Sequence, residues 1–265
     1  MADPDFGASW WLKAERANKH LQDINRLLDR MRDPKPGRVR VEKERQSIGW
    51  VYTVHHGIKP DRMLPLIIGD YLFNLRSALD HIAAANVKAT LFEKSQFPIF
   101  TDDFRTFHPD EPPRFKGYRD SWKGLRKRTN PAVFAAIEKA QPFETCLKDS
   151  SDPHNAALAL LNDFQNTDKH RQLGVIDAGL RDPSGFVVEK DGTRRPIIYK
   201  PLPADSMLQD GALCHISDEE VDVEFYGTIQ VAVTGGTNQR HLPTETLAKL
   251  WGEVVAVLEF ITEAM

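Results

Sequence analysis

The chain of 265 residues has little of what marks several protein classes. It contains only two cysteines, Cys146 and Cys214, so it has no disulfide framework and no thiolate zinc cluster. Its longest apolar stretches, 64–68 and 254–258, are far too short to span a bilayer, and its first residues lack the basic and apolar regions of a signal peptide. The sequence therefore predicts a soluble, cytoplasmic protein with no membrane partner.

A strong excess of charge of one sign is also missing. Lys and Arg number 35 against 38 Asp and Glu, a net charge of −3, so any binding of nucleic acid needs a local basic patch. The sequence has no Walker-type phosphate loop, no G-x-G-x-x-G, no G-x-S-x-G and no H-E-x-x-H. These absences disfavour several large enzyme classes.

The patterns that are present predict an α+β fold, a mainly helical bundle packed on a small antiparallel sheet. We expect one domain over 1–265, with a helical part at about 61–172, a strand-rich part at about 38–56 and 174–235, and a final helix at about 243–264. Apolar residues at helical spacing predict helices over 10–32, 61–89, 119–127, 131–140 and 153–170. The proline-rich segment 97–113 is predicted to be an irregular lid or binding loop.

Two predicted helices carry many polar residues in apolar surroundings, 70–81 and 162–171. On the first, a single stripe holds Asp70, Asn74, Ser77 and His81. Beside it, Arg76 and Asp80 form an i, i+4 pair. On the second helix, the comparable stripe and its flanking residues are Asn162, Asn166, Asp168, Lys169, His170 and Arg171.

These two stripes are open to two interpretations. If they face each other, their imidazole, carboxylate and guanidinium groups converge on a composite site. Alternatively, the polar residues are a buried hydrogen-bond network that fixes helix packing, with Asn74, Ser77, Asn162 and Asn166 as its members. Both interpretations predict that the two helices pack together and that Asp80 pairs with Arg76 or with a basic residue of 169–171.

Four blocks stand in this order in the chain: NLRSALDH at 74–81, FPI at 97–99, IEKAQPF at 137–143, and LN followed by TDKHR within 161–171. Together they resemble a family of uncharacterised bacterial proteins that shares these blocks, and the resemblance covers about 64–171. That family brings no activity with it.

Arg76 and His81 also resemble the Arg–His motif of the HEPN superfamily of helical ribonucleases and toxin or abortive-infection proteins. The resemblance implies that His81 is a general acid or base and that Arg76 holds a phosphate, with no metal and no cofactor. The chain departs from the motif at Ser77, where Asn often follows the Arg.

A metal site would use Asp80, His81, Asp168 and His170. Carboxylates and imidazoles are suitable ligands, but adjacent residues of a helix diverge by about 100° and rarely bind one ion together. A metal-dependent hydrolase is therefore the weakest interpretation, and we assign no metal ligand.

The segment 114–128 combines basic and aromatic residues in the way expected where phosphates are neutralised and bases stack. The candidate nucleic-acid-binding residues are Arg114, Lys116, Arg119, Trp122, Lys123, Arg126, Lys127 and Arg128. The alternative is a solvated helix face with its aromatic residues turned inward.

The sequence thus predicts a protein that binds RNA or cleaves it without a metal, as a toxin or phage-defence protein would. The alternatives are a non-catalytic module that binds a small ligand or a protein through 97–113, and the metal-dependent hydrolase. The identity of a small ligand and the formation of a homodimer stay open.

Overall fold

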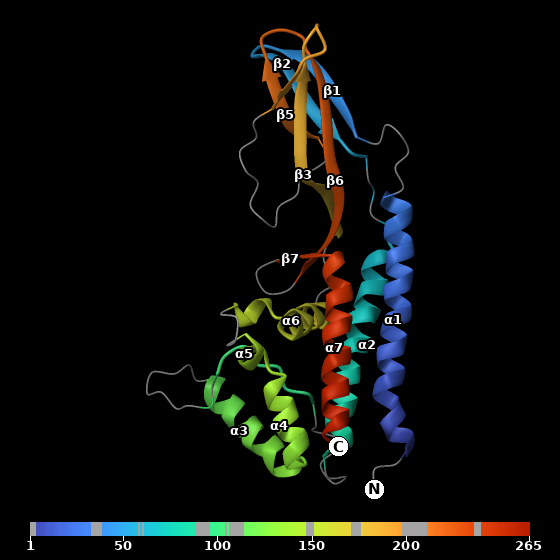
Figure 1. Cartoon of the computed structure of the whole chain (residues 1–265), viewed down its shortest axis with the longest axis vertical. Coiled ribbons are helices and arrows are strands. Elements are labelled where there is room, and N and C mark those ends of the chain that lie inside the picture. The colour runs from blue at the N-terminus through green and yellow to red at the C-terminus, as the bar shows by residue number, and fades with distance from the viewer. Residues whose placement is uncertain are drawn as a thin grey trace.

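The structure is a computed structural model, and it describes residues 4–32, 39–57, 59, 61–87, 96–103, 105, 114–146, 151–170, 176–197, 211–235 and 240–265. Its helices gather at one end of the molecule and its strands at the other (Figure 1). The N-terminus and the C-terminus both lie at the helical end (Figure 1).

Three long helices lie side by side and form the main bundle: α1 Pro4–Arg32, α2 Leu64–Ala85 and α7 Glu245–Glu263 (Figure 1). Each forms because apolar residues recur on one face, which the other two helices then cover. Two polar contacts between helices fix the bundle. The Tyr71 hydroxyl donates to the carbonyl of Leu247, and Trp251 Nε1 donates to the Ala14 carbonyl at 3.3 Å.

Shorter helices pack beside this bundle: α3 Arg114–Arg128, α4 Pro131–Lys139, α5 Pro142–Thr145, the 3₁₀ turn η2 Pro153–Asn155, and α6 Ala157–His170. Proline at the first helical position and an Asn130 side chain that accepts from the Ala132 N–H start α4. Asp152 caps η2 in the same way. Among the described residues, no helix combines the length and apolar character that a bilayer crossing requires.

The strands form two antiparallel sheets. The first has the order β1–β2–β5, from β1 Arg40–Gln46, β2 Gly49–His55 and β5 Ala212–Ser217. The second has the order β4–β3–β6–β7, from β4 Arg194–Pro196, β3 Ile176–Val188, β6 Asp222–Gly235 and β7 Arg240–Pro243. A small second core joins the sheets through Tyr52, Val54, Leu180, Cys214 and Phe225.

The α+β fold is confirmed, and the strand-rich part forms two sheets where the sequence predicts one. Among the helices, α1 begins six residues earlier than predicted, and α2 is shorter at both ends than 61–89. Residues 96–103 have no regular secondary structure, as predicted, whereas 104 and 106–113 lie outside the described residues.

Gly49 starts β2 at a place where a side chain does not fit. Its φ is +122°, and a Cβ built there would lie 2.5 Å from the carbonyl oxygen of Ser217 in β5. We expect Gly49→Ala to lower the free energy of unfolding by about 2–3 kcal/mol, through backbone strain and weaker pairing with β5.

Gly57→Ala is the matched control, because Gly57 also has a positive φ of 61° but has nothing within 4 Å of an added Cβ. It should cost only about 1 kcal/mol. Urea unfolding followed by circular dichroism measures both values, and equal losses would contradict the close approach of β2 and β5.

Candidate functional site

The predicted ion pair of α2 holds a neighbouring segment of backbone. Arg76 Nη2 lies 3.2 Å from Asp80 Oδ1 and donates to the carbonyl oxygen of Phe97 at 2.6 Å. The Phe97 N–H in turn donates to Asp80 Oδ1 at 2.9 Å. Arg76 is only 8% exposed, so its guanidinium serves as a buried clamp on the Phe97 backbone.

Gln141 holds the next residues of the same segment. Its amide nitrogen donates to the carbonyls of Pro98 and Ile137, both at 3.0 Å, and its amide oxygen accepts from the Phe100 N–H at 3.0 Å. The side chain is fully buried and uses both ends of its amide. We call residues 97–103 the strap, because side chains from α2 and from the turn between α4 and α5 fix its backbone.

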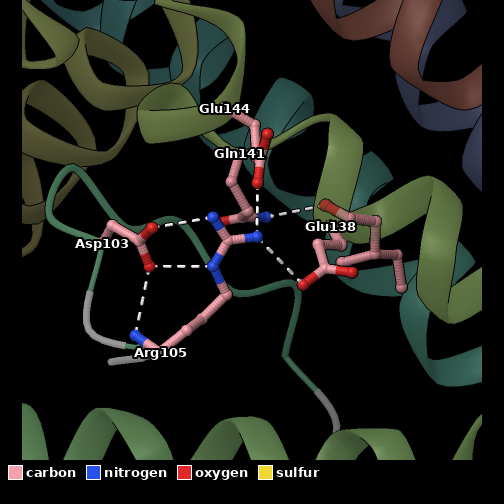
Figure 2. A network of polar contacts seen from close by, with 6 residues as sticks. Asp103, Arg105, Glu138, Gln141 and Glu144 are labelled. Atoms are coloured by element: carbon pink, nitrogen blue, oxygen red, sulfur yellow. Dashed lines mark hydrogen bonds and ion pairs between the residues drawn. The ribbon is translucent and has the colours of Figure 1, made fainter. Parts of the chain in front are cut away.

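Arg105 anchors the end of the strap (Figure 2). It makes ion pairs with three carboxylates, Asp103, Glu138 and Glu144, and its guanidinium lies 4.8 Å from the centre of the Phe143 ring. Hydrogen bonds from Arg105 lower the pKa of Asp103, and those to Asp103 raise the pKa of Arg105. The strap is therefore tied to α2 at its start and to α4 and α5 along its length.

The strap forms one wall of a cavity of about 640 Å³, which we call the amide cavity. Its residues come from the strap, α3, η2 and α6: Ile99, Phe100, Thr101, Tyr118, Asp152, His154, Ala159, Asn162, Asp163 and Asn166. Two of the sequence blocks line it, through Ile99 and Asn162. Arg76, Asp80 and Gln141, from the other two blocks, hold the backbone of the strap beside it.

The two faces of α6 explain why its amides line a cavity. Leu158, Leu161 and Phe164 are buried in the main core, where α6 packs against α2 and α7. Asn162 and Asn166 are one turn apart and point away from that core into the cavity. The small side chain of Ala159 on the same face leaves the space open.

A second hollow of about 520 Å³ lies between α3 and α4, and we call it the cationic pocket. Arg119, Lys123 and Arg126 line it from α3, together with Trp122, and Arg105 lines it near Glu138. Lys123 and Arg126 have no ion-pair partner among the described residues. Four of the predicted nucleic-acid contacts, Trp122 and these three α3 cations, thus lie at one concave surface.

An aromatic cluster separates the two hollows. The Phe100 ring in the amide cavity lies 4.9 Å from Tyr118 and 5.9 Å from Trp122, measured between ring centres, and Trp122 also packs on Phe134 at 4.8 Å. Trp122 is only 7% exposed. It therefore forms the floor of the cationic pocket and is not an open stacking surface.

Lys116, Lys127 and Arg128 of α3 are not among the described residues that line the pocket. Lys116 and Lys127 are exposed, and the Arg128 Nε donates to the Gly124 carbonyl of the same helix at 2.8 Å. The side chain of Arg114 lies outside the described residues. These positions extend the positive charge of α3 beyond the pocket.

Arg76 and His81 contact different elements. Arg76 faces the strap, whereas His81 Nδ1 lies 3.1 Å from the Ser9 hydroxyl of α1 and lines a shallow hollow with Lys13 and other α1 residues. Burial, followed by the nearby Lys13 charge, lowers the pKa of His81, which keeps the imidazole neutral at pH 7. The structure does not bring this pair to a common pocket.

Two expectations for the polar helices are confirmed: α2 packs against α6, and Asp80 pairs with Arg76. Asn74 donates within α2, to the Asp70 carbonyl at 2.7 Å, so it does not bridge the two helices. Ser77 is half-buried. The side chains of Asp168, Lys169 and His170, and the whole of Arg171, lie outside the described residues.

The residues that sequence reasoning missed are Gln141, Arg105, Asp152 and His154. Gln141 had a signal, because it stands directly between Ala140 and Pro142-Phe143, and a polar residue must find a partner if it is buried. The described residues contain no cluster of three or more His, Cys, Asp or Glu arranged to hold a metal ion.

Comparisons of the chain with protein-family models, curated proteins and solved structures find no match. The resemblances to the bacterial family and to the HEPN superfamily therefore stay predictions. Function has to be argued from the two hollows and the side chains that line them.

The clamp on the strap can be tested by removing its cation. Arg76→Met leaves the partly buried Asp80 carboxylate unpaired and the Phe97 carbonyl without its donor, and we expect a loss of roughly 3 kcal/mol in the free energy of unfolding. Arg76→Met with Asp80→Asn should recover part of that loss, since no carboxylate is then left unpaired. Urea unfolding measures each variant.

Lys19→Met is the control. Lys19 and Glu15 form an i, i+4 pair at 3.1 Å on the exposed surface of α1, with side chains 69% and 59% exposed. Its loss should be at most about 0.5 kcal/mol. If Arg76→Met costs no more than Lys19→Met, the clamp does not stabilise this fold.

Proposed function

We propose that this protein binds single-stranded RNA through α3 and the cationic pocket. The observation that carries the proposal is the position of Lys123 and Arg126, two cations with no ion-pair partner among the described residues, in a hollow large enough to receive part of a nucleotide. Phosphate is the ligand that such a pair of donors suits best.

The charge of α3 supports this function. The helix carries seven basic residues against a single carboxylate, Asp120, in a chain whose net charge is −3. Like charges three or four residues apart on a helix repel each other, and an anionic ligand relieves that repulsion. The positive electrostatic field of α3 is therefore local. A protein with a negative net charge needs such a local patch to bind nucleic acid.

A solvated helix face explains this pattern less well. Basic residues in the last turn stabilise a helix through its dipole, which accounts for Arg126, Lys127 and Arg128. That effect does not extend to Lys116 and Lys123, which lie before the last turn. Neither does it explain why Lys123 and Arg126 border a concave surface.

Single-stranded RNA fits the shape better than a duplex does. Proteins that bind single strands combine a positively charged groove along the backbone with nearby surfaces for unstacked bases. The amide cavity lies across the Phe100–Trp122 contact from the cationic pocket, so a base and its phosphates have separate places to bind.

Removal of the α3 cations should change both the affinity for RNA and its salt dependence. Replacing Lys123, Arg126 and Lys127 with Ala should weaken binding of a 12-residue single-stranded RNA by at least tenfold. The plot of log affinity against log salt should also become less steep, by about 0.7 for each phosphate that is no longer neutralised, or about 2 in total. Fluorescence anisotropy over a salt series measures both quantities.

A variant with the same change of net charge is the control. Arg16, Lys19 and Arg30 are exposed on α1, and their replacement with Ala should leave both affinity and salt slope close to those of the wild type. Equal losses in the two triple variants would mean that net charge alone governs binding. Unchanged binding in the α3 variant would overturn the proposal.

The proposal is binding and not cleavage, because Arg76 and His81 contact different elements. We expect the same RNA to stay intact during incubation with the protein in EDTA, since a buried Arg76 already bonded to Phe97 does not reach a phosphate. Gel analysis of labelled RNA measures this. Products ending in a 2′,3′-cyclic phosphate that disappear with His81→Ala would contradict it and restore the nuclease hypothesis.

A further inference from the structure

We propose that the amide cavity binds an adenine base of the RNA strand whose phosphates lie on α3. The inference rests on the proposed function for its partner, and it assigns a separate site with its own recognition chemistry. It starts from Asn162 and Asn166, whose side chains have no hydrogen-bond partner among the described residues although both border a cavity.

The two amides are arranged to recognise a ligand edge. They lie at i and i+4 on α6, so their side chains are neighbours on one helix face. A primary amide offers both a donor and an acceptor, and Asn in this role forms paired hydrogen bonds with the N6 amino group and N7 of adenine. Asn162 is half-buried and Asn166 is exposed, so both amides are open to a ligand in the cavity.

The cavity has the size and the walls that a base requires. Its volume of about 640 Å³ lies within the range of about 300–1,000 Å³ typical of small-molecule sites. Opposite the amides, Phe100 and Tyr118 form an aromatic wall with their ring centres 4.9 Å apart and their planes at 49°. Aromatic rings stack on bases because both have flat apolar faces.

The charges of the lining residues determine which part of a nucleotide enters the amide cavity. Asp152 and Asp163 line the amide cavity, which carries no Lys or Arg among its described lining residues, so a phosphate is repelled there. Across the Phe100–Trp122 contact, the cationic pocket attracts phosphate through Lys123 and Arg126. The geometry thus places a neutral base in one hollow and the negative backbone at the other.

The strap makes the cavity a preorganised site. Gln141 fixes the backbone on both sides of Ile99, and Arg76 and Asp80 fix Phe97. Phe100 and Thr101 therefore face the cavity from a backbone whose position does not depend on the ligand. A site held in this way loses less conformational entropy when it binds.

The test compares 12-residue oligo(A) and oligo(U), which carry the same number of phosphates. We expect the wild-type protein to bind oligo(A) about tenfold more tightly, the order of discrimination that a paired amide–adenine contact gives. Replacing Asn162 and Asn166 with Ala should bring the two affinities to within about twofold of each other. The salt slope should not change, because every phosphate keeps its cation.

Asn18 and Gln22 provide the matched control, since they are also amides one turn apart, on α1. Their replacement with Ala should leave the preference for oligo(A) intact. Asn166→Ala alone is a second variant, chosen because Asn166 is exposed and its loss does not disturb the α6 core face. It should lower the preference several-fold, with the circular dichroism spectrum unchanged.

Free adenosine separates this inference from the proposed function, because it carries no phosphate. Saturation-transfer NMR should detect adenosine binding by the wild type and by the α3 triple variant, but not by the Asn162/Asn166 variant. Equal affinity for oligo(A) and oligo(U), together with no adenosine signal, would overturn the base site and leave RNA binding in place. Adenosine binding without affinity for either oligonucleotide would instead overturn RNA binding and support the cavity as a nucleoside site.

Discussion

The buried ion pair of Arg76 and Asp80 is the interaction on which the candidate site depends. Both side chains bond the backbone of one residue, Arg76 at the Phe97 carbonyl and Asp80 at the Phe97 N–H, so their charges are compensated by each other and by backbone dipoles. A buried pair is costly unless its remaining donors and acceptors are used. Here the Phe97 backbone meets part of that requirement, and among the described residues Arg76 Nη1 stays buried without a hydrogen-bond partner. These contacts give a segment with no regular secondary structure a fixed position.

The same principle extends along the strap. A segment outside helices and sheets must find partners for its N–H and C=O groups elsewhere. Gln141 provides them for Pro98 and Phe100, and Arg105 joins the end of the strap to three carboxylates. Side chains thus replace the hydrogen bonds that a neighbouring strand would supply. The consequence is a rigid wall from which Phe100 can face a cavity without being drawn into the core.

The features that depend on residues close together in the sequence could be predicted from the sequence. Apolar periodicity gave α1, α2 and α7, alternation gave the β1–β2 hairpin, and the i, i+4 rule gave the Arg76–Asp80 pair. Helix geometry also shows why Arg76 and His81 do not act together. Five residues on a helix correspond to about 500° of rotation, so their side chains point about 140° apart. The division of the strands into two sheets depends on contacts between distant segments, such as Tyr52 with Val221, and no local signal contains it.

The two hollows also depend on contacts between distant segments, so they could not be predicted from the sequence. Each is bordered by side chains from several segments, and Asn162 meets Phe100 only because the strap is fixed between α2 and α4. The sequence did show the chemical groups involved, namely the excess of basic residues on 114–128 and the amides on 162–166. Folding separates these groups across a wall of aromatic rings, with the amides and two carboxylates at one hollow and an excess of cations at the other. A nucleotide has the same division into a flat neutral base and a charged phosphate, and this correspondence is why one short region of the surface suits both parts of such a ligand.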